Sequence, residues 1–221
     1  MIRVCSRLFV VVACILGFST AAHAVPIIDL FNTGVAGSGL LLVGGDGTID
    51  PHYDVVSGPG IPSTGVDAVT YFNTAYFPDG PSSRWISSSS NGFPGNGTFV
   101  FQTAFTLSPQ FDPAATSIQV SCATDNFLSG VNLNGSDVAG DCDGFGAFSA
   151  PFSITSGFQG GLNVLRFSVL DTGPPMAFRA EYVSNTRVLP DPDPAAVPEP
   201  ASMLLLGFGL AAMRLCRGRR S

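Results

Sequence analysis

TFVFQTAFTL, residues Thr98–Leu107, is the clearest structural signal in this chain of 221 residues. Phe99, Phe101, Thr103, Phe105 and Leu107 fall on one face of an extended chain, and the residues between them fall on the other. Alternation with a period of two is typical of a β-strand that buries one face against a core. The stretch therefore predicts a half-buried strand.

Shorter stretches of the same kind extend the prediction to both sides. Further strands are expected at Ser117–Ala123, Phe127–Leu133, Phe148–Ile154, Leu162–Leu170 and Met176–Val183, with weaker signals at His52–Val56, Val69–Phe72 and Arg84–Ile86. In the stretch Met176–Val183, Phe178, Ala180 and Tyr182 share a face opposite Arg179 and Glu181.

Turn residues and the lack of helical periodicity give the fold class. Asn134-Gly135 is a strong turn signal, because both residues tolerate positive φ. The 26 glycines and 17 prolines break helices and supply further turns. We expect an all-β fold, namely an antiparallel two-sheet β-sandwich of the jelly-roll kind, flanked by an N-terminal signal helix and a short apolar C-terminal helix.

The N-terminus has the three parts of a secretory signal peptide. Arg3 and Arg7 form a basic region, Leu8–Phe18 is apolar over 11 residues, and Ala22-His23-Ala24 is an A-x-A cleavage site. We expect residues 1–24 to be removed. An N-terminal membrane helix is the alternative, for which the apolar stretch is short.

The segment between the two ends of the chain is acidic. Residues 25–196 contain four arginines, no lysine and 15 acidic residues, a formal charge of −11. Such a charge argues against nucleic acid or anionic lipid as a partner. We expect a β-sandwich domain at 25–184 and a Pro-rich linker at 185–196.

The C-terminus, residues 197–221, has three parts in a fixed order. Val197-Pro198-Glu199-Pro200 precedes an apolar run, Met203–Leu215, and a basic cluster made of Arg214, Arg217, Arg219 and Arg220. The 13 residues of the run span roughly 20 Å as a helix, whereas a bilayer core is about 30 Å thick. The arginines favour a cytoplasmic C-terminus. A short permanent membrane anchor is one interpretation, and a removable sorting signal is the other.

The Pro-Glu-Pro motif, the apolar run and the arginine cluster together resemble the PEP-CTERM sorting tail. The resemblance covers about residues 197–220. It implies recognition by a membrane-embedded exosortase, cleavage near the motif, and transfer to the cell envelope, cell surface or extracellular matrix. Bacteria with such tails make extracellular polysaccharide, which becomes a candidate partner.

A second resemblance concerns the domain itself and spans about residues 30–183. The stretches that carry it include Thr98–Leu107, Ala123-Thr124-Asp125-Asn126, Asn132-Leu133-Asn134-Gly135 and Gly161–Phe167. In this order they look like the galactose-binding-like β-sandwich module of PEP-CTERM proteins and secreted carbohydrate-binding domains. That family implies a fold and a tendency to bind glycans, but no reaction.

Glycan binding has four candidate residues. Trp85, the single tryptophan, would stack on a sugar ring while Arg84 binds its hydroxyl groups, and the alternative is a tryptophan in the core. Asp125 and Asn126 would line a binding edge, and the alternative is that they cap turns through backbone amides.

A loop calcium ion is the one candidate cofactor. Asp137, Asp141 and Asp143 cluster in a Gly-rich stretch, and hard cations bind carboxylate and carbonyl oxygens. Solvated loop acids are the alternative. Asp46 and Asp50 form a weaker pair.

Two cysteines and one histidine remain after the signals are removed. Cys122 and Cys142 could form a disulfide in an oxidising compartment; the alternative is a buried Cys122 and an exposed Cys142. His52 is the sole remaining histidine, so any Ser-His-Asp triad would depend on it. We expect a non-catalytic surface or matrix protein. A lectin-like module for extracellular polysaccharide, assisted by calcium, is the alternative.

Overall fold

The computed structural model describes residues 24–25, 27 and 29–187, and this part of the chain is all-β. Its strands are β1 (Ala24–Val25), β2 (Ile49–Ser57), β3 (Val66–Thr70), β4 (Ile86–Ser87), β5 (Gly97–Leu107), β6 (Ser117–Asp125), β7 (Phe127–Leu133), β8 (Ser136–Val138), β9 (Phe152–Ile154), β10 (Gly161–Asp171) and β11 (Ala177–Arg187). They form one antiparallel sheet in the order β8-β7-β10-β5-β2-β3-β4-β11-β6-β9, and β1 pairs with β11 beside this path.

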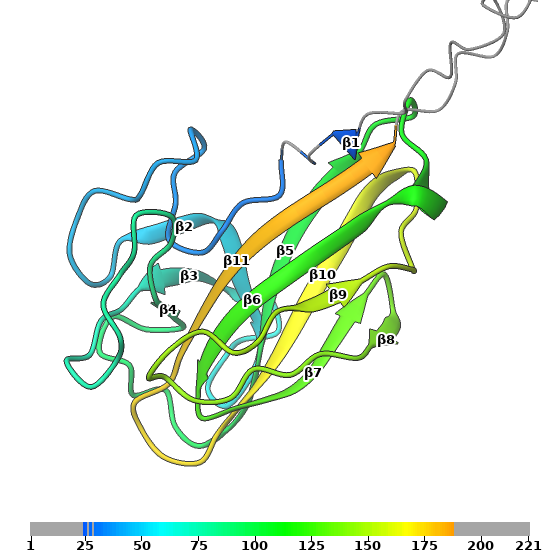
Figure 1. The fold of residues 1–221 in the computed structure, drawn as a ribbon. Coiled ribbons are helices and arrows are strands. Elements are labelled where there is room, and N and C mark those ends of the chain that lie inside the picture. Colours follow the sequence, from blue (N-terminus) through cyan, green and yellow to red (C-terminus); the bar gives the residue numbers. More distant parts are fainter. Residues whose placement is uncertain (1–23, 26, 28, 188–221) are drawn as a thin grey trace, which may run out of the picture. The chain divides into compact units, whose positions relative to one another are not determined.

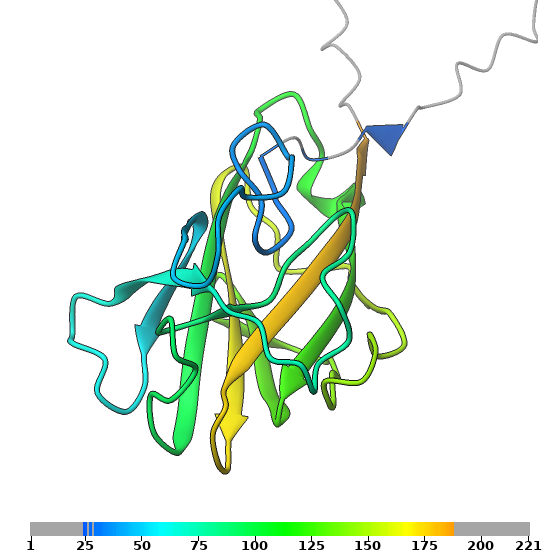
Figure 2. The ribbon, with the colours of Figure 1, turned by 90° about the vertical axis from the view of Figure 1, so that its left-hand side faces the viewer.

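The sheet curls on itself and is nearly barrel-shaped, so that β11 and β6 lie across the core from β5 and β10 (Figure 1). The perpendicular view shows the strands wrapping around a shared interior (Figure 2). Rings from both sides meet there, because the Phe178 centroid lies 5.2 Å from that of Phe101 and 4.9 Å from that of Phe167.

The predicted two-sheet sandwich is not confirmed. The two halves of the sheet are joined through short strands: Val69 of β3 pairs with Ser87 of β4, and Ile86 of β4 pairs with Phe178 of β11. One continuous sheet therefore encloses the core. The sequence did not reveal this connection, because β4 is only two residues long.

The strand predicted at Thr98–Leu107 is confirmed as β5. Phe99, Phe101, Thr103, Phe105 and Leu107 are all buried, and the residues between them are partly or fully exposed. β5 pairs with β10 over its whole length, with Phe101 opposite Phe167. The alternation therefore predicted both the strand and the face that it buries.

Most other strands are also where the sequence placed them, with shifted ends. β7 has the predicted bounds, whereas β9 begins at Phe152 rather than Phe148. β11 continues to Arg187, three residues into the range predicted as a linker. The pattern missed β8, which pairs with β7 through the Asn134-Gly135 turn. That turn is confirmed, with φ of 53° at Asn134 and 88° at Gly135.

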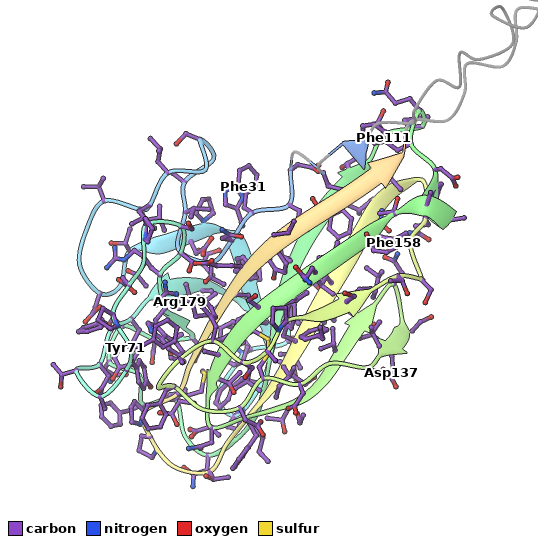
Figure 3. All side chains as sticks on the ribbon, in the orientation of Figure 1. Phe31, Tyr71, Phe111, Asp137, Phe158 and Arg179 are labelled. Atoms are coloured by element: carbon purple, nitrogen blue, oxygen red, sulfur yellow. A yellow bond between two sulfur atoms is a disulfide. The ribbon has the colours of Figure 1, made fainter. Side chains whose placement is uncertain are left out.

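A second apolar cluster covers the outer face of β6 and β11. Its buried members are Tyr71, Tyr76, Trp85, Ala123 and Ala177, and Phe77 and Phe148 pack against them. Arg179 of β11 lies in the same region and is only 1% exposed (Figure 3). The side of β11 opposite Phe178 is thus covered by loops rather than open to water.

Helical structure is scarce in the described residues. It consists of one 3₁₀ turn, Pro113–Ala115, with Asp112 as its N-cap. None of the helical structure in this part of the chain is long and apolar enough to span a membrane. The predicted signal helix and C-terminal apolar helix lie outside the described residues, as do residues 188–196 of the predicted linker.

Candidate functional site

A shallow pocket of about 470 Å³, here called the Arg84 pocket, contains charged side chains. Its lining residues are Gly45, Asp46, Phe72, Pro78, Asp79 and Arg84. They come from two loops: the one before β2 and the one that connects β3 to β4. The pocket is therefore a product of tertiary folding and has no local sequence signature.

Arg84 is held firmly at the wall of this pocket. Its Nε donates to Asp79 Oδ2 over 2.8 Å, and its Nη1 donates to the carbonyl oxygens of Leu42 and Gly44 over 3.0 and 2.9 Å. Its Nη2 takes part in none of these bonds. The guanidinium is thus fixed in place while one of its nitrogens keeps its hydrogen-bonding capacity.

Phe72 and Asp46 form another part of the lining. The Phe72 side chain is 38% exposed, and its backbone N–H donates to Asp46 Oδ1 over 3.0 Å. The Arg84 pocket thus combines an accessible ring, two carboxylates and a guanidinium. Such a set can stack on an apolar ring face and exchange hydrogen bonds with hydroxyl groups.

Trp85 does not belong to this pocket. Its side chain is 0% exposed, its Nε1 donates to the Phe77 carbonyl over 3.0 Å, and its ring lies 4.6 Å from that of Tyr76. The prediction of an exposed stacking platform is therefore corrected in favour of the core alternative. The reason is that residues 76–77 fold back over the outer face of the sheet and cover the indole.

Asp125 ends β6 and Asn126 follows it; Asn126 binds a backbone amide, as its alternative interpretation expects, whereas Asp125 binds side chains. Asp125 Oδ2 accepts from the Tyr76 hydroxyl over 2.9 Å, and Asn126 Oδ1 accepts from the backbone N–H of Thr172 over 2.8 Å. Asp125 is 3% exposed. Tyr76 contacts both Asp125 and Trp85, and both of these predicted residues are buried rather than placed at a binding edge.

The three loop aspartates do not gather around one point. Asp137 pairs with Asn132 near one end of β7, whereas Asp143 bridges Phe127 at the other end. Five residues of strand separate these partners, or about 17 Å at about 3.3 Å per residue. Among the described residues no group of three or more His, Cys, Asp or Glu side chains could hold a metal ion. The calcium candidate at Asp137, Asp141 and Asp143 is therefore corrected.

Cys122 and Cys142 are joined by a disulfide, with Cα atoms 5.5 Å apart. Both residues are buried. The Cys142 carbonyl also accepts hydrogen bonds from Thr124 Oγ1 and from the backbone N–H of Leu128. The bridge therefore fastens the segment after β8 to β6.

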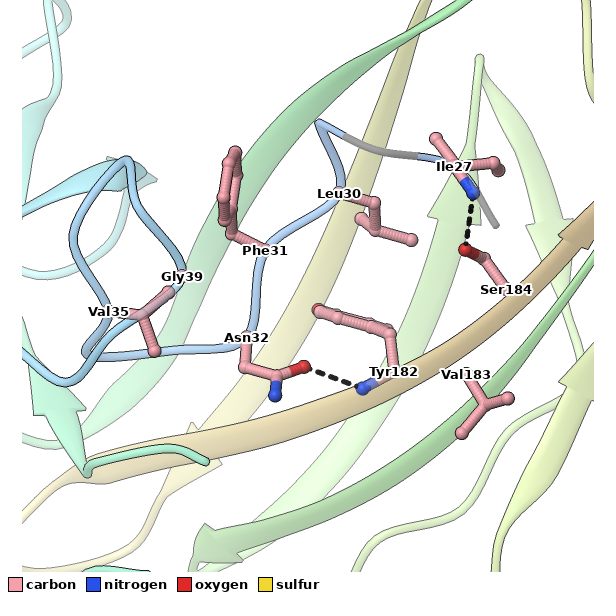
Figure 4. Close-up of a pocket in the computed structure, with 9 residues that line it drawn as sticks. All are labelled: Ile27, Leu30, Phe31, Asn32, Val35, Gly39, Tyr182, Val183 and Ser184. Atoms are coloured by element: carbon pink, nitrogen blue, oxygen red, sulfur yellow. Dashed lines mark hydrogen bonds between the residues drawn. The ribbon is translucent and has the colours of Figure 1, made fainter. Parts of the chain in front are cut away.

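A second pocket, of about 350 Å³, lies beside β11 and is here called the Tyr182 pocket (Figure 4). Its lining residues are Ile27, Leu30, Phe31, Asn32, Val35, Gly39, Tyr182, Val183 and Ser184. Asn32 Oδ1 accepts from the Tyr182 backbone N–H over 2.8 Å, and Ser184 Oγ accepts from that of Ile27 over 2.9 Å. No sequence pattern predicted this pocket, because the segment that forms its wall has no regular secondary structure.

His52 and Asp50 lie close to the Tyr182 pocket. The His52 ring stacks on Phe31 with centroids 3.9 Å apart, and its Nε2 is buried without a hydrogen-bond partner among the described residues. Burial lowers the pKa of His52. Asp50 is 2% exposed, and burial raises its pKa to about 6 against the lowering effect of backbone bonds from Gly34 and His52.

The predicted sorting motif and basic cluster lie outside the described residues, but a comparison of the sequence with known protein families covers them. Residues 196–220 match the PEP-CTERM protein-sorting motif. The motif implies export and processing by exosortase, a membrane enzyme. A comparison with curated proteins gives no match. The resemblance of the domain to a galactose-binding-like module stays a prediction.

Proposed function

We propose that this protein is a non-catalytic component of the cell surface or extracellular matrix, delivered there through its PEP-CTERM tail. The observation that carries the proposal is the match at residues 196–220. The Cys122–Cys142 disulfide supports it, because disulfides persist outside the reducing cytoplasm. The excess of acidic residues suits a soluble extracellular domain.

The tail acts as a sorting signal that is cleaved off, rather than as a permanent membrane anchor. The apolar run Met203–Leu215 is shorter than the bilayer core, and the arginines after it stay on the cytoplasmic side. Pro198 and Pro200 disfavour continuation of a helix upstream of the apolar run. Exosortase cleaves there and releases the domain.

A non-catalytic role is supported by the surroundings of His52. A general base must lie within hydrogen-bond reach of the proton that it takes. The His52 Nε2 is buried under Phe31 and has no hydroxyl or carboxylate partner among the described residues. Within the described part of the chain, this nitrogen has neither the serine hydroxyl nor the carboxylate of a Ser-His-Asp triad as a hydrogen-bond partner.

The sorting function is tested by replacing Pro198-Glu199-Pro200 with three alanines in the full chain, in a bacterium that makes exosortase. We expect the wild-type protein to reach the surface or medium with a C-terminus near residue 200, as read by mass spectrometry. The variant should stay in the membrane fraction at full length.

The chain supplies a matched control in Pro192-Asp193-Pro194, which repeats the proline-acid-proline pattern upstream. Its replacement by three alanines should leave sorting intact. Identical location and processing of the wild type and the 198–200 variant would overturn the proposal.

The Arg84 pocket supports a second candidate function, the binding of neutral extracellular polysaccharide. Phe72 offers a ring for stacking on a sugar. The Arg84 guanidinium can donate hydrogen bonds to sugar hydroxyl groups, and the carboxylates of Asp79 and Asp46 can accept hydrogen bonds from them. An acidic polysaccharide fits less well, because the domain itself is strongly negative.

Affinity electrophoresis of the secreted protein in gels that contain neutral or acidic polysaccharides tests this candidate. We expect retardation by a neutral polysaccharide that Phe72→Ala abolishes. Phe127→Ala is the matched control, because Phe127 is 48% exposed and lies on β7. Retardation that survives Phe72→Ala, or no retardation at all, would remove the candidate and leave the sorting proposal untouched.

A further inference from the structure

The chain contains three Asn-Gly pairs: Asn91-Gly92, Asn96-Gly97 and Asn134-Gly135. In such a pair the glycine nitrogen can attack the asparagine Cγ, because glycine has no side chain to keep the two groups apart. A nitrogen–carbon bond forms, and the amide group leaves as ammonia with the proton of the glycine N–H. Water then opens the resulting cyclic imide to aspartate or isoaspartate. A fold suppresses this deamidation wherever it immobilises both reacting groups.

The pair Asn134-Gly135 is immobilised in the turn between β7 and β8. Asn134 Oδ1 accepts from the Val164 N–H over 2.9 Å, and its Nδ2 donates to Asn163 Oδ1 over 2.8 Å. The Gly135 N–H donates to Asn132 Oδ1 over 2.9 Å. The amide and the attacking nitrogen are both engaged, so reaction there requires the turn to open.

The pair Asn91-Gly92 is also held at both groups. Asn91 Oδ1 accepts from Ser89 Oγ over 2.9 Å, and the Gly92 N–H donates to the Ser89 carbonyl over 3.2 Å. The Gly92 carbonyl accepts from the Met176 N–H over 2.9 Å. Gly92 is buried, and a β-carbon on it would collide with the Tyr71 ring. This close packing fixes the glycine backbone in place.

The pair Asn96-Gly97 is held less firmly than the other two. Asn96 is exposed, and its side chain makes one hydrogen bond within the described part of the chain, from Nδ2 to the Thr172 carbonyl over 3.0 Å. Gly97 is the first residue of β5 and pairs with Asp171 at the very end of the β5–β10 ladder. The ends of a strand pair open more readily than its middle. Asn96 therefore reaches a reactive geometry through a small local opening.

We propose that Asn96 is the site at which the folded protein deamidates, and that the change loosens the end of the β5–β10 pair. Aspartate at this position has no N–H to donate to the Thr172 carbonyl and instead places two oxygens against each other. Isoaspartate lengthens the main chain by one carbon directly before Gly97, which disturbs its pairing with Asp171. The modification needs only water and is independent of the proposed sorting and polysaccharide binding.

The three pairs serve as controls for one another in a single experiment. The folded full chain and the same chain in denaturant are kept at mildly alkaline pH, and digests are followed by mass spectrometry. In denaturant all three asparagines should react at similar rates, because no contact holds any of them. In the folded protein we expect Asn96 to react at least about tenfold faster than Asn91 and Asn134.

The structural consequence is measured with Asn96→Asp, which contains the product from the start. Hydrogen exchange should be severalfold faster in the first residues of β5 than in the wild type. Asn91→Asp is the matched control, because it adds the same charge while Asn91 uses only its Oδ1, as an acceptor, in its described hydrogen bonds. An aspartate keeps that acceptor. Exchange in β5 should therefore stay at the wild-type rate in Asn91→Asp.

Three outcomes would overturn the proposal. The first is deamidation of Asn91 or Asn134 in the folded protein at least as fast as that of Asn96. The second is an unmodified Asn96 in the folded protein after the denatured chain has reacted. The third is equal hydrogen exchange at the start of β5 in Asn96→Asp and Asn91→Asp, which would mean that the modification does not loosen the strand pair.

Discussion

The Tyr182 hydroxyl lies 2.6 Å from the Tyr53 hydroxyl, and Tyr53 in turn donates to the Phe31 carbonyl over 3.1 Å. Because the single proton of Tyr53 goes to Phe31, Tyr182 is the donor between the two hydroxyls. This chain of bonds ties β11, β2 and the segment that walls the Tyr182 pocket to one another. Burial raises the pKa of both phenols, so both stay protonated and able to donate at neutral pH.

The direction of these bonds predicts that Tyr53→Phe destabilises the protein more than Tyr182→Phe. Loss of the Tyr182 hydroxyl removes one bond, at about 1 kcal/mol, whereas loss of the Tyr53 hydroxyl leaves a donor and an acceptor without partners, at about 2 kcal/mol. Urea unfolding of the two variants measures the difference. Equal costs, or a larger cost for Tyr182→Phe, would mean that the bonds run differently.

Asp50 predicts a pH dependence of stability. Its folded pKa of about 6 lies above the ordinary value of 3.8, so the folded state holds the proton more tightly than the unfolded state. The free energy of unfolding should therefore fall as pH rises from about 4 to about 6 and then level off, by at most about 3 kcal/mol for this group.

Asp50→Asn isolates that contribution, because other raised carboxyls titrate in both proteins. We expect the decrease between pH 4 and 6 to be smaller in Asp50→Asn than in the wild type. Asp141→Asn, at an exposed loop position, should follow the wild-type curve. Parallel curves for all three proteins would show that Asp50 does not titrate in this range.

The parts of the fold that the sequence predicted are those set by neighbours along the chain. Alternation in β5 follows from backbone geometry alone, and Asn134-Gly135 supplies the two positive φ values that its tight turn requires. Arg179 shows the limit of this reasoning. Alternation placed it opposite Phe178, as observed, but its burial depends on loops that are distant in sequence.

The candidate sites were harder to predict for the same reason. Asp137 and Asp143 are near in sequence, but a strand pairing carries them to opposite ends of β7. Arg84 and Phe72 belong to one long loop, and the Gly45 and Asp46 part of the pocket comes from another loop that joins them only in the folded protein.

Reduction of the disulfide should measurably lower the stability of the domain. Cys122 and Cys142 close a loop with a sequence separation of 20, for which loop-closure entropy gives about 3 kcal/mol. For a domain of this size that corresponds to a fall in melting temperature of about 6–12 °C. Thermal unfolding with and without reducing agent measures it. Cys122→Ala/Cys142→Ala should melt at the lower temperature and should not respond to the reducing agent.

Arg179 has a charged side chain that is almost completely buried. Its guanidinium lies 4.6 Å from the centre of the Phe77 ring and 5.0 Å from that of Phe148. Its Nε donates to Ser83 Oγ and its Nη1 to the Pro78 carbonyl, each over 2.7 Å. A flat cation with several donors fits this arrangement, because it can face a ring and bind two oxygens at once.

Lysine should therefore be a poor substitute for Arg179. Arg179→Lys keeps the charge but cannot face two rings and reach both oxygen atoms, so we expect a loss of about 3 kcal/mol, in the range for a broken buried ionic contact. Arg166→Lys is the matched control, because Arg166 is exposed on β10 and its Nε binds Gln102; it should cost less than about 0.5 kcal/mol. Urea unfolding compares the two. Similar small losses would mean that the charge alone matters at Arg179, and the outer cluster would then be held by its aromatic side chains.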